Sequence, residues 1–132
     1  MEFHLKLIGS LLIVLALAHI FFPRHFNWKA ELQSLSMINR QIMYVHAFFI
    51  GLMVLLMGIL CVSNYQDLIE TPFGRKVCLG LGLFWACRLA IQWFGYSPKL
   101  WRGKSFETAI HIILTIFWIY LCIVFLSIYY VF

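Results

Sequence analysis

Four long stretches of almost uninterrupted apolar residues divide this chain, with short polar segments between them. A helix that crosses the hydrocarbon core of a bilayer needs about 20 mostly apolar residues, and each stretch approaches or exceeds that length. The four stretches cover residues 5–22, 41–62, 72–96 and 108–132. The pattern therefore predicts an all-α, polytopic membrane protein in which four transmembrane helices form one bundle, a single domain over residues 1–132.

Turn and capping residues mark the ends of these stretches. Pro23 closes the first, because proline has no amide hydrogen and restricts the residue before it. The pair Thr71-Pro72 is typical of an N-cap followed by proline in the first helical position. Ser105 is the predicted N-cap of the fourth stretch, where Glu107 would lie near the positive end of the helix dipole.

The segment between the first two stretches has a pattern of its own. Residues 27–35 read NWKAELQSL and predict a short amphipathic helix at the membrane interface. The first stretch is expected to remain as a span rather than be cleaved as a signal peptide. Its basic region consists of Lys6 alone, and residues 20–23 do not resemble a small-residue cleavage site.

Composition supports the membrane class. Of the 132 residues, 64% are hydrophobic and 11% are charged, whereas soluble domains average about 45–50% and about 25%. These values exclude a soluble enzyme domain, a disordered chain and a small secreted domain held by disulfides. The four cysteines lie within or at the ends of the stretches without C-x-x-C spacing, so we interpret them as small packing residues.

The distribution of basic residues predicts an orientation. The loops 23–40 and 97–106 carry six basic residues, and the opposite side carries three. The first set is Arg24, Lys29, Arg40, Lys99, Arg102 and Lys104, and the second is Lys6, Arg75 and Lys76. The positive-inside rule then places loops 23–40 and 97–106 in the cytoplasm and both termini outside. The net charge of +5 follows from these loops, and the scattered basic residues carry no nucleic-acid-binding motif.

Candidate chemistry gathers at one depth of the predicted bundle. His19 lies four residues before Pro23, and His46 and His111 lie about five and four residues inside the second and fourth stretches. All three are therefore about 6–8 Å below the cytoplasmic boundary. Gln92 lies at the same depth, and Arg88 lies one turn deeper on the same face. Because ionisable residues inside a membrane usually turn toward the bundle interior, these side chains are predicted to converge around one site.

Arg88 is the clearest candidate within this layer, because an arginine does not lose its charge. It needs an acceptor, and Glu107 or a bound anionic ligand would supply one. We therefore take Arg88, Gln92 and Glu107 as candidate catalytic residues. The structural alternative is that Arg88 forms an ion pair or caps backbone carbonyl groups.

The histidines suggest cofactors, none of which the sequence identifies. His46 and His111 on facing helices would be able to hold haem b axially. His19, His46 and His111 with an open position would be able to hold zinc, iron or copper. Without a metal, a histidine would act as acid or base while arginine holds an anionic headgroup. The alternative, that these histidines are hydrogen-bonded packing residues, stays open.

Three function classes remain. The first is a membrane enzyme or redox protein that uses this layer on a lipid-soluble substrate. The second is a non-catalytic small subunit or assembly factor of a larger membrane complex, and the third is a small oligomeric transporter. Histidine boxes, H-E-x-x-H, paired carboxylates and a Gly-rich phosphate loop do not occur. The expected partners are the lipid bilayer and other membrane subunits or further copies of the chain, and the sequence does not decide between the first two classes.

Overall fold

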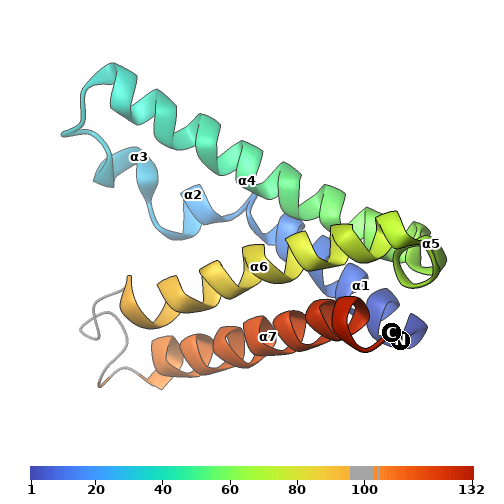
Figure 1. Cartoon of the computed structure of the whole chain (residues 1–132). Coiled ribbons are helices and arrows are strands. Elements are labelled where there is room, and N and C mark those ends of the chain that lie inside the picture. The colour runs from blue at the N-terminus through green and yellow to red at the C-terminus, as the bar shows by residue number, and fades with distance from the viewer. Residues whose placement is uncertain (96–102, 104) are drawn as a thin grey trace. The chain divides into compact units, whose positions relative to one another are not determined.

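All regular secondary structure in the part that the computed structural model describes, residues 1–95, 103 and 105–132, is helical (Figure 1). The helices are α1 (Glu2–Ala18), α2 (Phe22–His25), α3 (Trp28–Glu31), α4 (Met37–Ser63), α5 (Tyr65–Glu70), α6 (Pro72–Phe94) and α7 (Ser105–Tyr130). They form two compact units, one over residues 3–65 and the other over residues 1–2 and 66–132. The predicted all-α class is confirmed.

Three helices within the described residues are long and apolar enough to cross a membrane, namely α4, α6 and α7. The predicted bundle of four transmembrane helices is not confirmed. The helix in the first stretch, α1, has 17 residues and is about 25 Å long at 1.5 Å per residue. The hydrocarbon core of a bilayer is about 30 Å thick, so α1 falls short where the sequence predicted a span over residues 5–22.

The early end of α1 follows from its hydrogen bonds. After Ala18, the amides of residues 20–22 donate to carbonyl groups three residues back, in place of the four-residue spacing of an α-helix. Pro23 follows directly, and it neither donates a hydrogen bond nor fits inside a continuing helix. The chain turns here and begins the separate short helix α2 at Phe22. The sequence located the break at Pro23 correctly but extended the apolar helix too far toward it.

In the unit formed by residues 3–65, α1 and α4 run antiparallel and touch backbone to backbone. A Cβ atom added at Gly58 would lie 2.8 Å from the carbonyl oxygen of Gly9, and one added at Gly9 would lie 2.7 Å from the carbonyl oxygen of Gly58. Farther along, Gly51 of α4 faces His19 just beyond the end of α1. Glycine is therefore required where the two helices cross.

The predicted interfacial helix over residues 27–35 is present only in part. The segment contains α3, which has four residues, and α2 precedes it. Asn27 separates the two helices with a left-handed backbone conformation at φ 55°, which asparagine tolerates better than most residues. That turn separates α3 from α2, and α3 itself ends at Glu31 with Leu32 as its C-cap, four residues before the predicted end at residue 35.

In the second unit, Thr71 caps the N-terminus of α6 as predicted. Its hydroxyl oxygen accepts a hydrogen bond from the Gly74 amide at 2.9 Å and donates one to the carbonyl oxygen of Asp67 at 2.6 Å. The fourth stretch differs slightly, since Ser105 is the first residue of α7 rather than the residue before it. Some predictions lie outside the described residues. They concern residue 96, at the end of the predicted third span, and the basic residues Lys99, Arg102 and Lys104.

Helices α6 and α7 lie side by side as an antiparallel pair (Figure 1). Trp85 and Trp118 stack at their centre with ring centroids 4.8 Å apart and an interplanar angle of 11°. Gly82 admits Leu126, whose Cδ2 would lie 2.7 Å from an added Cβ atom. All four cysteines are free, and Cys61, Cys78 and Cys122 are buried, in agreement with a packing role.

Replacing Gly58 by alanine tests the crossing of α1 and α4. The new methyl group would collide with the Gly9 carbonyl oxygen, so the helices must separate, and we expect a loss of about 1–3 kcal/mol of unfolding free energy. Gly80→Ala is the matched control because nothing lies within 4 Å of its Cβ position; alanine should stabilise that helix by up to about 1 kcal/mol. Denaturant titration of the protein in detergent measures both changes. Equal effects of the two substitutions would contradict the close crossing.

Candidate functional site

A chain of hydrogen bonds joins three of the predicted site residues across α6 and α7. Nη1 of Arg88 donates to Oε1 of Gln92 at 3.2 Å, one helical turn along α6. The amide nitrogen of Gln92 then lies 3.1 Å from Nδ1 of His111 on α7. Gln92 is 4% exposed, so its amide joins the two helices within the interior. The predicted convergence of Arg88, Gln92 and His111 is therefore observed.

The donor and the acceptor of each of these hydrogen bonds follow from which groups are able to donate and which to accept. Arginine has no acceptor, so the Gln92 atom facing Arg88 must be the oxygen. The nitrogen of the same amide therefore faces His111, and because it only donates, Nδ1 of His111 must accept. His111 is thus held as the tautomer with its hydrogen on Nε2. Gln92 fixes both the guanidinium and the imidazole through one side chain.

A pair of stacked indoles lies directly beside these hydrogen bonds. The guanidinium carbon of Arg88 lies 5.2 Å from the centre of the Trp118 ring, a distance at which a cation is attracted to the ring face. Trp85 and Trp118 are 2% and 3% exposed. Each buries its indole N–H without an acceptor among the described residues. Two buried donors therefore lie beside the arginine in the interior of the α6–α7 pair.

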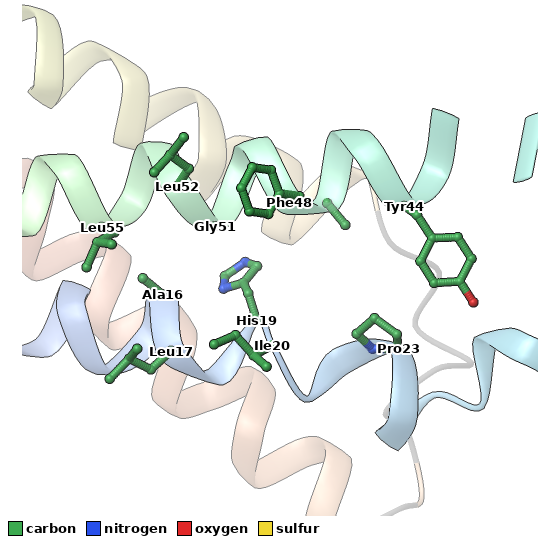
Figure 2. A pocket seen from close by; sticks show the side chains of 11 residues that line it. Ala16, Leu17, His19, Ile20, Pro23, Tyr44, Phe48, Gly51, Leu52 and Leu55 are labelled. Carbon is green, nitrogen blue, oxygen red and sulfur yellow. The ribbon is translucent and has the colours of Figure 1, made fainter. Parts of the chain in front are cut away.

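The other unit holds a pocket between α1 and α4 (Figure 2). Its volume is about 340 Å³, near the lower end of the range for small-molecule sites. The residues that line it are Ala16, Leu17, His19, Ile20, Pro23, Tyr44, Ala47, Phe48, Gly51, Leu52 and Leu55. Apart from His19 and Tyr44, every one of these side chains is apolar.

His19 is held in place by contacts on several sides. Its Nδ1 lies 2.8 Å from the carbonyl oxygen of Leu15, and its ring lies against Phe22 with centroids 4.5 Å apart. A Cβ atom at Gly51 would lie 3.2 Å from the His19 Cβ, so the missing side chain of Gly51 makes room for the histidine. Figure 2 shows the imidazole directed from the chain after α1 toward α4.

The other predicted site residues take no part in the hydrogen bonds that join Arg88, Gln92 and His111. His46 is exposed and does not line the pocket that contains His19, although both belong to the same unit. Glu107 is exposed, and an acceptor that Arg88 meets is the side-chain oxygen of Gln92. Glutamine has a side-chain oxygen at one-turn spacing from Arg88, which places it within reach along the same helix face.

The predicted cofactor sites receive no support from the geometry. Within residues 1–95, 103 and 105–132, no three or more His, Cys, Asp or Glu side chains are grouped so that they could hold a metal ion. The proposed ligands His19, His46 and His111 are therefore not supported as a metal cluster. His46 and His111, the predicted axial ligands of haem, belong to different compact units.

Sequence reasoning missed the pocket and the stacked indoles. The pocket depends on small residues, Ala47 and Gly51, which stand four positions apart on α4 with Leu55 four positions further. Residues four positions apart lie on the same face of a helix, so two small residues at this spacing leave a depression in that face. This spacing was the one feature of the sequence that indicated a pocket. Trp85 and Trp118 lie on two helices that the sequence predicted as membrane spans, but the sequence did not predict that their rings would stack.

Comparisons with protein-family models, with curated proteins and with solved structures find no match to this chain.

Replacing Gln92 by leucine tests the chain of hydrogen bonds. The substitution removes one bond to a charged group and one to a neutral group, so we expect a loss of about 2–4 kcal/mol of unfolding free energy. Gln92→Glu keeps an acceptor for Arg88 and should lose less than Gln92→Leu. Denaturant titration in detergent compares the two variants with Ile91→Leu, a change at the neighbouring exposed position. If Gln92→Leu were as stable as Ile91→Leu, the amide would not join the two helices energetically.

Proposed function

We propose that this chain is a membrane protein that binds a lipid-soluble molecule in the pocket between α1 and α4. The observation that carries the proposal is the combination of an apolar pocket of about 340 Å³ with one imidazole fixed in its wall. Small-molecule sites are typically apolar cavities with few, well-placed polar groups that orient the ligand. Three helices that by length and composition are able to cross a membrane supply the setting.

The rim of the pocket favours a ligand that arrives through the bilayer. Leu17, Ile20 and Phe48 line the pocket and are each more than half exposed, at 51%, 69% and 64%. Exposing these apolar side chains to water would be unfavourable in free energy, whereas exposing them to hydrocarbon carries no such cost. A molecule dissolved in the acyl-chain region would therefore meet an apolar entrance.

The pocket is also elongated. Its residues on α4 form a single stripe from Tyr44 to Leu55, which is about 16 Å at 1.5 Å per residue. Polar atoms lie near the Tyr44 end and at His19, whereas Leu52 and Leu55 form the other end. This arrangement suits an amphiphilic molecule whose polar group lies beside His19 and whose apolar part points toward Leu55.

Photolabelling tests this function directly. A long-chain hydrocarbon probe with a diazirine group, added to the protein in lipid nanodiscs, should label residues 16–23 and 44–55 more strongly than the exposed residues of α6 and α7. Ala47→Phe places a ring in the pocket and should reduce that labelling at least about fivefold, since the added ring occupies the ligand's volume.

Val45→Phe is the matched control, because it adds the same ring to α4 at an exposed position outside the pocket. It should leave the labelling unchanged. Even labelling along all apolar helix faces, or an equal loss in both variants, would show that the probe merely reports contact with bulk lipid and would refute the proposal.

A further inference from the structure

We infer that the ligand of this pocket is a neutral amphiphile with a hydroxyl group, and that this hydroxyl donates a hydrogen bond to Nε2 of His19. The inference rests on the proposed function, since it names the class of molecule that the α1–α4 pocket takes. It follows from which nitrogen of the imidazole carries the hydrogen.

The Leu15 carbonyl decides that question. A carbonyl oxygen only accepts hydrogen bonds, so the contact of 2.8 Å requires Nδ1 of His19 to donate. A neutral imidazole carries one hydrogen, which leaves a lone pair on Nε2. His19 makes no hydrogen bond from Nε2 to the described part of the chain. The pocket wall therefore presents an acceptor that lacks a donor.

The other described residues that line the pocket supply no hydrogen-bond donor for Nε2 of His19. No lysine, arginine, aspartate or glutamate is among the described residues that line the pocket. Tyr44 packs its ring edge-on against Trp28, with centroids 5.5 Å apart, and Figure 2 shows its hydroxyl at the far end of the pocket, pointing away from His19. A ligand must bring the donor itself.

The same wall disfavours other head groups. An ionised carboxylate or phosphate would be buried without a counter-ion, which is costly. A ketone, ester or ether would place an acceptor oxygen against the lone pair of Nε2 and leave both without a hydrogen. An alcohol or phenol satisfies Nε2 and carries no charge.

The position of Nε2 is set by the backbone rather than by the ligand. The hydrogen bond to Leu15, the contact with Phe22 and the absence of a side chain at Gly51 hold the ring before any ligand enters. A site that is already ordered loses little conformational freedom on binding. Selectivity for a hydroxyl group is therefore built into the free protein.

A matched pair of competitors tests the inference in lipid nanodiscs. 4-Octylphenol and 4-octylanisole share a skeleton, but the second replaces the hydroxyl hydrogen by a methyl group. Each is titrated against the diazirine hydrocarbon probe, and labelling of residues 44–55 is the readout. In the unmodified protein, the phenol should compete about 3- to 10-fold more strongly, after correction for its partition into lipid, because one hydrogen bond separates the two.

Two substitutions of His19 assign that preference to Nε2. The side-chain amide of His19→Asn is able to replace Nδ1 in donating to Leu15, but it places no acceptor where Nε2 was, so phenol and anisole should compete equally. The longer side chain of His19→Gln places its amide near the Nε2 position and should restore part of the preference. Unchanged discrimination in His19→Asn would overturn the inference.

The experiment distinguishes failure of the hydroxyl-ligand inference from failure of the proposed function. Equal competition by phenol and anisole, with labelling still concentrated in the pocket, would refute the hydroxyl ligand and leave the lipid-soluble ligand standing. Labelling that is never concentrated in the pocket would refute the proposed function itself. The comparison in the unmodified protein needs no variant, so it holds even if a His19 substitution prevents folding.

Discussion

A polar side chain inside a hydrocarbon layer must find its hydrogen-bond partner within the protein, because the surrounding solvent offers none. Two sites in the described helices show how side chains meet this constraint, whereas the buried N–H groups of Trp85 and Trp118 have no acceptor among the described residues. Between α6 and α7, one amide meets both an arginine and a histidine. Beside α1, the histidine turns back to a carbonyl group one helical turn earlier. In each case, the partner is another part of the same compact unit.

The two histidines illustrate how a neighbouring group determines what an imidazole offers. His111 accepts through Nδ1 from the Gln92 amide and so carries its hydrogen on Nε2. His19 donates through Nδ1 to Leu15, so its neutral form carries a lone pair on Nε2. The same side chain is therefore a donor at one position and an acceptor at the other. This difference depends on partners that are distant in sequence for His111 and local for His19.

The sequence predicted the helical class and the approximate positions of α4, α6 and α7, because long apolar runs and a Thr-Pro cap are local signals. It also placed Arg88 and Gln92 on one face and His111 at the matching depth, since helical spacing fixes those positions. It extended the first apolar run past Ala18, where the chain turns ahead of Pro23. Equal depth along a helix does not fix the direction of a side chain around it, and His46 accordingly lies outside the pocket that His19 lines.

The stacked indoles of α6 and α7 have an optical consequence. Two nearly parallel tryptophan rings with centroids 4.8 Å apart are close enough for their electronic transitions to couple. Where the two transition moments are twisted relative to one another within the ring planes, this coupling gives a couplet, a pair of circular-dichroism bands of opposite sign. Such a couplet arises only while both rings keep their mutual orientation. The antiparallel pair thus carries an intrinsic spectroscopic signature of its own packing, independent of events beside α1 and α4.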